Sequence, residues 1–166
     1  TYALLGTIRL VSGDHGEAVV LGEQAVALSP NGADVAALLA YTLIYTGDLE
    51  RSIGLLDRAM RLSPSYPDWY RWTLGQAYRL TGRYEDAVGA FTTHLDDNPD
   101  ALTPHVELVV TYSEMGDEAR ARAEAAEVRR INPGFSIQIW TQAPRYKDPA
   151  VTRRDIETLR RAGLPE

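Results

Sequence analysis

Residues that break helices recur along this chain with a single period, and this periodicity constrains the fold more than any other feature of the sequence. Four glycines are separated by 34, 35 and 34 residues: Gly13, Gly47, Gly82 and Gly116. Four prolines are separated by the same intervals: Pro30, Pro64, Pro99 and Pro133. Since self-similarity with a period of about 20 to 50 residues is typical of solenoids, the spacing predicts four copies of one structural unit.

The third period is the clearest and shows what each unit contains. Leu74 and Tyr78 lie four residues apart and would share one face of a helix. Gly82 is expected to end this helix, because glycine readily adopts the positive φ found at helix C-termini. A second amphipathic run follows, with Ala87 and Phe91 on its buried side. Each period therefore predicts a helix, a turn and a second helix.

One position in every second helix is small, as close crossing of two helices requires. Its four copies are Ala18, Ser52, Ala87 and Ala121. An aspartate follows three of the periodic glycines, in Gly13-Asp14, Gly47-Asp48 and Gly116-Asp117. Aspartate at this place is expected to cap the next helix, because its carboxylate accepts free backbone N–H groups. We expect Asp68 to cap the first helix of the third unit and Asp148 the last helix of the chain.

The third unit resembles the tetratricopeptide repeat (TPR), a helix–turn–helix of about 34 residues. The resemblance is carried by Leu74, Gly75, Tyr78, Gly82, Ala87, Phe91 and Pro99. It implies an all-α fold, a right-handed α–α superhelix (TPR solenoid) of four helix pairs plus C-terminal capping helices. The implied repeats are residues 1–32, 33–67, 68–101 and 102–134, the first of them truncated at its N-terminus. We expect residues 135–166 to cap the last repeat, with a terminal helix at about 149–162.

Composition narrows the classes of function. Apolar residues make up 45% of the 166 residues, which favours a folded chain. No apolar run approaches the ~20 residues that cross a bilayer, so we expect no membrane partner for this fragment. The chain has no cysteine, which removes disulfides and thiolate chemistry and agrees with a cytoplasmic location. A net charge of −6 argues against nucleic acid as the partner.

Residues that could carry catalysis are few and scattered. The histidines lie in different repeats, without a second ligand at the spacing of a helical zinc site: His15, His94 and His105. The acidic run at residues 96–100 lacks the glycine and the distal glutamate of an EF-hand loop. Glycine-rich phosphate loops and a Gly-x-Ser-x-Gly elbow are missing. We therefore expect no enzymatic activity, no cofactor and no metal site in this fragment.

The TPR resemblance implies that a partner binds in the concave groove lined by the first helices of the pairs. Carried over by repeat position, the groove residues are Leu38, Tyr41, Ile44, Tyr45, Trp69, Trp72, Gln76, Arg79, Glu107 and Val110. Aromatic side chains with polar tips are common interface anchors, so we predict a mainly apolar peptide or helix, oriented by Arg79 and Glu107. The same spacing also allows Tyr41, Tyr45 and Trp72 to pack between repeats as core.

The C-terminal tail carries a narrower resemblance. Residues 133–137, 145–149 and 159–166 read PGFSI, RYKDP and LRRAGLPE. These segments are similar to the C-terminus of bacterial proteins that join a class III adenylate/guanylate cyclase domain, or sometimes a transcription-regulator domain, to a TPR array. The resemblance implies that this chain is the regulatory part of a larger signalling protein that can carry a cyclase domain. Two other functions stay open: a homodimerisation module for an attached catalytic or DNA-binding domain, and a spacer without a specific ligand.

Overall fold

Helices are the only regular secondary structure in the part of the chain that the structure, a computed structural model, describes (residues 2–142, 144 and 146–166). The helices are α1 (Tyr2–Val11), α2 (His15–Leu28), α3 (Ala33–Thr46), α4 (Leu49–Leu62), α5 (Trp69–Leu80), α6 (Tyr84–Asp97), α7 (Leu102–Glu114), α8 (Glu118–Ile131), α9 (Ile137–Trp140) and α10 (Pro149–Arg161). The predicted all-α class is confirmed. Residues 143 and 145, which belong to the expected tail motif and its loop, lie outside the described residues.

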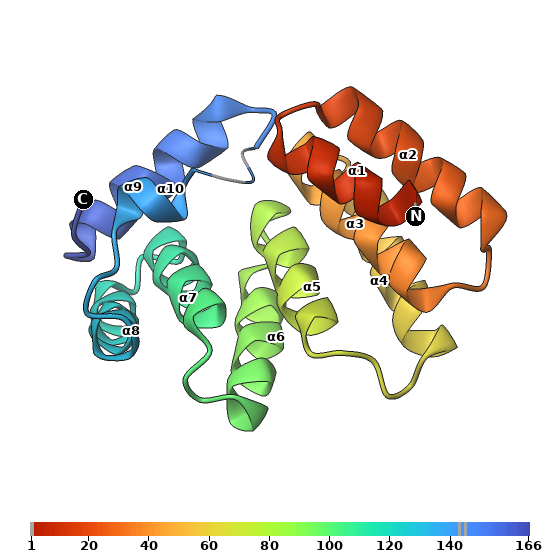
Figure 1. Ribbon diagram of the computed structural model, residues 1–166. Helices are drawn as coiled ribbons and strands as arrows, with labels where there is room; N and C mark the ends of the chain where they lie inside the picture. The colour runs from red at the N-terminus through yellow and green to blue at the C-terminus, as the bar shows by residue number, and fades with distance from the viewer. Residues whose placement is uncertain (1, 143, 145) are drawn as a thin grey trace.

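The first eight helices form four pairs that stack in chain order (Figure 1). Each pair also packs on the next, through α2 on α3, α4 on α5 and α6 on α7. The first helices touch one another as well, α1 with α3, α3 with α5 and α5 with α7. They therefore line one common side of the array, which we call the inner side.

The four periodic glycines make the turns inside the pairs. Their φ angles are +83°, +90°, +77° and +80° for Gly13, Gly47, Gly82 and Gly116. This is the left-handed region that side chains with a Cβ rarely adopt, so glycine is required at each turn. The predicted role of these glycines in ending the first helices is confirmed.

The capping aspartates behave unequally. Asp14 accepts a hydrogen bond from the Glu17 N–H at 3.2 Å, and Asp117 accepts one from the Arg120 N–H at 3.0 Å. Asp148 likewise accepts from the Ala150 N–H at 2.8 Å.

Two of the predicted caps were wrong. Asp48 and Asp68 precede their helices but make no side-chain capping bond. The Asp68 carboxylate instead accepts a hydrogen bond from the Asn98 side chain at 2.7 Å, which ties α5 to the end of α6. The Asp68 side chain therefore makes a tertiary hydrogen bond in place of the expected capping bond.

Close helix crossings leave no room for side chains at specific glycines. A Cβ on Gly75 would lie 2.5 Å from Cε1 of Phe91, and one on Gly22 would lie 2.8 Å from Cδ1 of Leu39. The small residues predicted in the second helices are all fully buried: Ala18, Ser52, Ala87 and Ala121.

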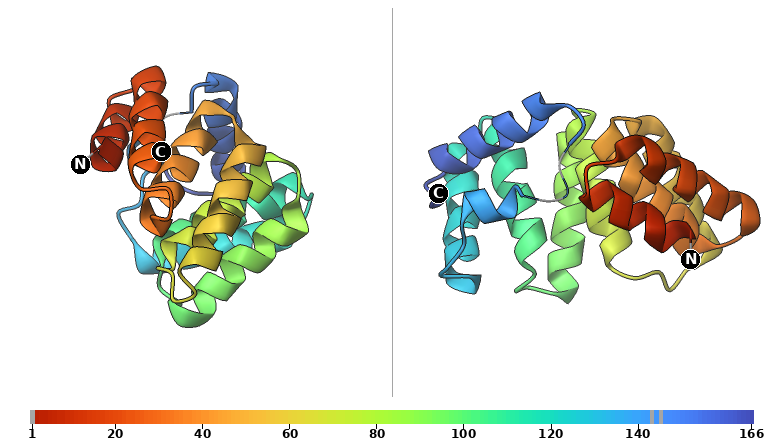
Figure 2. Two further views of the ribbon diagram at one scale, coloured as in Figure 1. Left: turned by 90° about the vertical axis from the view of Figure 1, so that its right-hand side faces the viewer. Right: turned by 45° about the horizontal axis from the view of Figure 1, so that its top comes forward.

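The chain turns back on itself after the fourth pair. Leu159 of α10 is buried in one cluster with Val106 and Val110 of α7 and Val128 of α8. The right-hand view of Figure 2 shows the last helices beside the fourth pair and the first pair at the opposite end. No helix of the described chain is long and apolar enough to cross a membrane.

Candidate binding groove

The inner side of the array is covered by the chain's own C-terminal strap, defined as α9, α10 and the described residues between them. In Figure 1, α10 begins near the earlier pairs and ends beside α7 and α8. Just before α10, the Lys147 N–H donates a hydrogen bond of 2.7 Å to the Tyr45 carbonyl at the end of α3. The sequence predicted a segment that covers only the end of the array, whereas this strap also crosses the predicted groove.

A buried arginine joins the inner side to the strap. Arg79 of α5 is 2% exposed, and its Nη1 and Nη2 each donate to Asp155 of α10 at 3.1 Å. Its Nε donates to Glu107 of α7 at 3.0 Å, and Glu114 lies 3.7 Å from Nη1. Arg154 of α10 pairs with the other oxygen of Glu114 at 3.0 Å. Two guanidinium groups thus meet three carboxylates, and the two-pronged pair with Asp155 has the geometry that arginine and carboxylates favour.

Burial changes the protonation equilibria of this cluster. Desolvation raises the pKa of Glu107 and of Glu114, and it outweighs the opposing field of Arg79. For Arg79 itself, burial acts to lower the pKa, but the surrounding carboxylates raise it well above its usual value. The guanidinium therefore stays charged, and removing one of its partners would leave part of a buried charge unpaired.

Aromatic rings continue the contact between α3 and the strap. Tyr45 stacks on Tyr146 with ring centroids 4.9 Å apart and planes 29° apart. Tyr41 meets Tyr45 edge-on at 5.0 Å and Trp72 edge-on at 5.9 Å. Burial raises the pKa of Tyr45 well above its usual value, so this ring is neutral in the physiological range.

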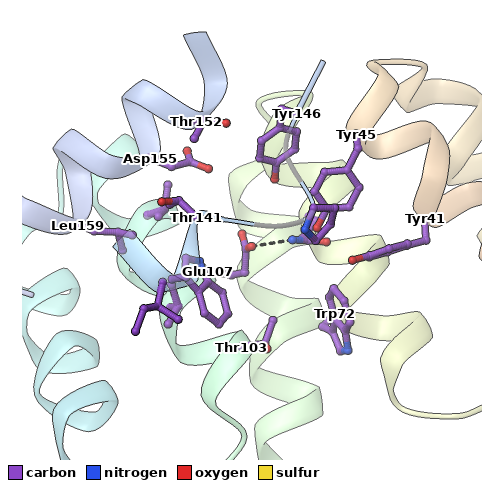
Figure 3. Close-up of a pocket in the computed structure, with 16 residues that line it drawn as sticks. Tyr41, Tyr45, Trp72, Thr103, Glu107, Thr141, Tyr146, Thr152, Asp155 and Leu159 are labelled. Carbon is purple, nitrogen blue, oxygen red and sulfur yellow. Dashed lines mark hydrogen bonds between the residues drawn. The ribbon is translucent and has the colours of Figure 1, made fainter. Parts of the chain in front are cut away.

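A cavity of about 340 Å³ remains between the inner helices and the strap (Figure 3). From the array it is lined by Tyr41, Tyr45, Trp72, Gln76, Thr103, Val106, Glu107 and Val110. From the strap it is lined by Ile139, Trp140, Thr141, Pro144, Tyr146, Thr152, Asp155 and Leu159. Its size falls near the lower end of the ~300–1,000 Å³ typical of ligand pockets.

Most of the predicted groove residues come together around this cavity, but four do not line it. Arg79 is engaged by the carboxylates beside it. Ile44 is 1% exposed and belongs to the core, whereas Leu38 is only partly buried. Trp69 packs on Tyr70 with ring centroids 4.5 Å apart.

Sequence reasoning missed Tyr146 and Asp155 as groove residues. Both belong to the tail, which the sequence places at the end of the array, and their contacts arise only once the chain folds back. The one available signal was that Arg79 and Glu107 carry opposite charges at groove positions of neighbouring repeats. No group of three or more histidine, aspartate or glutamate side chains suited to a metal ion was found among the described residues.

The stacked helix pairs and the lined inner side define the class of the molecule, an α-solenoid with a groove. Two family models, both described as tetratricopeptide repeat, match residues 10–74 and 74–103. Residues 10–103 therefore belong to the tetratricopeptide repeat family, which agrees with the expectation of a non-catalytic scaffold. The matches do not reach residues 133–166, and the comparisons give no support for the expected resemblance to cyclase-linked proteins.

Solved structures with the same fold cover nearly the whole chain. The crystal structure of MamA has a TM-score of 0.66 and 19% identity, and the match covers 95% of this chain and 91% of that one. PilW, a type IV pilus biogenesis factor, has a TM-score of 0.74 and 16% identity, with 97% and 71% covered. TTC0263, a thermophilic TPR protein in Thermus thermophilus, has a TM-score of 0.72 and 19% identity, with 97% and 84% covered. No curated protein sequence matched the chain.

Proposed function

We propose that this chain is a protein–protein interaction scaffold whose inner groove binds a peptide or helix that offers an aromatic side chain and a carboxylate. The observation that carries the proposal is that the groove already holds a polypeptide, the strap. It does so through a main-chain hydrogen bond to Tyr45, a stack on the same ring and a two-pronged pair between Arg79 and Asp155. A partner that offers an aromatic residue and a carboxylate at matching positions would compete for the same contacts.

The strap has an advantage over any free partner because it is tethered. A short tether gives an effective concentration in the range of ~1 mM, so a free peptide of equal intrinsic affinity binds weakly to the intact chain. A substitution in the strap that removes one of its contacts weakens this intramolecular competition. The groove residues that would bind the free peptide stay unchanged. This difference makes the proposal testable on the full chain.

The test uses a fluorescent peptide with the sequence of residues 146–159, YKDPAVTRRDIETL. We expect the full chain carrying Asp155→Asn to bind it at least about 10-fold more tightly than the unmodified chain, because Arg79 is then free to pair with the peptide aspartate. Fluorescence anisotropy measures the affinity. A peptide with asparagine in place of that aspartate should bind less tightly.

Glu157→Gln is the matched control, because it removes an exposed carboxylate from the same helix without touching Arg79. It should leave peptide affinity at the level of the unmodified chain. Equal affinities for all three chains, or no binding to Asp155→Asn, would contradict a peptide-binding groove.

A second candidate function, self-association, is favoured by an exposed apolar face of α1. Leu4, Ile8 and Val11 are 66%, 53% and 52% exposed, and their spacing places them on one face of α1. A contiguous exposed apolar stripe of this kind is typical of an interface. A second copy of this chain would bury it and bring two attached domains together.

Light scattering over a dilution series tests self-association. If the stripe is the interface, the unmodified chain should be dimeric at micromolar concentration, and Leu4→Glu with Ile8→Glu should make it monomeric. Leu62→Glu provides a control, since Leu62 is 41% exposed but lies at the end of α4, in the second pair. A monomer at all concentrations would exclude this function.

The larger protein inferred from the tail stays a prediction. That this chain forms the regulatory end of a bacterial, cytoplasmic signalling protein with a cyclase domain rests on residues 133–137, 145–149 and 159–166. The reading frame that surrounds the coding sequence decides it, because a cyclase domain would be encoded directly upstream.

A further inference from the structure

We propose that the cavity between the inner helices and the strap is a binding site for an alkylammonium group that carries N–H donors. This site goes beyond the peptide-binding function, since it exists while the strap is in place. Its walls combine negative charge, aromatic faces and a buried acceptor without a donor among the described residues, and each of these points to the same kind of ligand.

The first feature is an excess of negative charge. The carboxylates of Glu107 and Asp155 line the cavity, and no basic side chain does so among the lining residues that the structure describes. Behind this wall, Arg79 and Arg154 face three carboxylates, the third being Glu114. Counted over the described residues, one negative charge is thus left unbalanced in a buried region, where charge interactions are stronger than in water. A cation in the cavity would supply the missing positive charge.

The second feature is a corner of aromatic rings opposite the acids. The Tyr41 ring meets the Trp72 ring at 87° and the Tyr45 ring at 67°. Figure 3 shows these three rings on one side of the cavity and Asp155 on the other, with Glu107 between them. Ring faces attract a cation within about 6 Å of their centres, and they also pack well against an alkyl chain.

The third feature is an acceptor that lacks a donor. Gln76 lines the cavity and is only 4% exposed. Its Nε2 donates to Glu107 at 2.7 Å, which fixes the orientation of the amide, since the opposite orientation would set two oxygens against each other. Its Oε1 has no hydrogen-bond partner within the described structure. A buried acceptor is normally satisfied, so a ligand with N–H groups fits better than a quaternary ammonium.

The volume of about 340 Å³ suits a short amine. Two sources share this chemistry: a free alkylamine, and the side chain of a lysine in another polypeptide. The same acceptors and rings would receive either one, so the ligand class is defined by the ammonium group and its alkyl stem.

The experiment titrates the intact chain with n-butylamine and, separately, with Nα-acetyl-lysine methylamide. Binding is followed by calorimetry and by tryptophan fluorescence, because Trp72 and Trp140 line the cavity. We expect at least one of the two amines to bind, and n-butanol, butyrate and butyltrimethylammonium to bind at least about 10-fold more weakly. The tighter amine identifies the source.

Variants then locate the site. Trp72→Leu and Gln76→Leu should each weaken amine binding by about 10-fold or more. Trp69→Leu is the matched control, because Trp69 begins the same helix but lies outside the cavity. Tyr41→Leu provides a further variant at a partly buried position if Gln76→Leu loses its helical circular dichroism.

Failure of both amines to bind, equal binding of n-butylamine and n-butanol, or full affinity in folded Trp72→Leu would overturn the proposal. None of these measurements involves a partner peptide. A negative result here would therefore leave the peptide-binding proposal unaffected, and a failed peptide titration would leave this one unaffected.

Discussion

At the scale of single residues, glycines inside helices serve different purposes. Gly75 lies against Phe91, which is 0% exposed, and a Cβ on Gly75 would lie 2.5 Å from the Phe91 ring. Gly89 lies within α6, and a Cβ there would meet nothing within 4 Å. The first is required by packing, whereas the second only lowers the stability of its helix.

We predict opposite effects of alanine at these two positions. Gly75→Ala should lower the free energy of unfolding by ~1–3 kcal/mol, because overpacking against Phe91 outweighs the gain in helix propensity. Gly89→Ala should raise it by ~0.5–1 kcal/mol. Urea denaturation followed by circular dichroism measures both. Stabilisation by Gly75→Ala would show that the α5–α6 crossing is looser than described.

A histidine links the two helices of the fourth pair and makes their stability depend on pH. His105 Nδ1 lies 2.6 Å from a carboxylate oxygen of Glu124, and Nε2 lies 2.9 Å from the Pro99 carbonyl oxygen. Burial acts to lower the pKa of His105, but these hydrogen bonds outweigh it and raise the pKa above 6.5. Protonated His105 therefore stabilises the fold.

The stabilisation by His105 should be complete below about pH 6.5 and lost as the pH rises through the raised pKa of the folded state. We expect His105→Gln to reduce the free energy of unfolding by ~1–2 kcal/mol at about pH 6, and by less at about pH 8. Urea titrations at both pH values test this. Glu124→Gln should weaken the same pH dependence. If His105→Gln lowered the free energy of unfolding by the same amount at both pH values, a charged His105 would be excluded.

At the scale of elements, the helix pairs could be predicted from the sequence and the position of the strap could not. Gly47 and Gly82 end their helices through a local backbone conformation with positive φ, and the presence of glycine in the sequence is enough to predict it. The pairing of Arg79 with Asp155 depends on where α10 comes to rest, and no local pattern encodes that. Most of the repeat residues that line the cavity were therefore predictable by position, whereas the segment that covers them was not.

The hold of the strap on the groove can be tested at its amides. Asp155→Asn removes the two-pronged partner of Arg79 and should open the strap without unfolding the repeats, because Glu107 still pairs with the guanidinium. We expect hydrogen exchange at the Lys147 amide, which donates to Tyr45, to accelerate by at least about 10-fold, while α1 and α2 at the far end of the array exchange as before. Glu157→Gln should exchange like the unmodified chain. Unchanged exchange at Lys147 would mean that the ion pair does not secure the strap.

At the scale of the whole molecule, the array departs from the simplest form of a solenoid. In that form each repeat contacts only its neighbours, and stability is close to a sum of local terms. Here Tyr45 of the second pair and Arg79 of the third both contact the strap, which follows the fourth. Unfolding of the middle repeats is therefore coupled to release of the C-terminus.

The bond between Tyr45 and Lys147 also has a mechanical consequence. A superhelix held only by neighbouring contacts can stretch and recoil gradually, like a spring. A contact across its inner side, such as this one, resists a change in the curvature of the superhelix until the contact breaks. When the two ends of this chain are pulled apart, we expect little extension until the contact between the strap and α3 breaks. The superhelix should then extend abruptly.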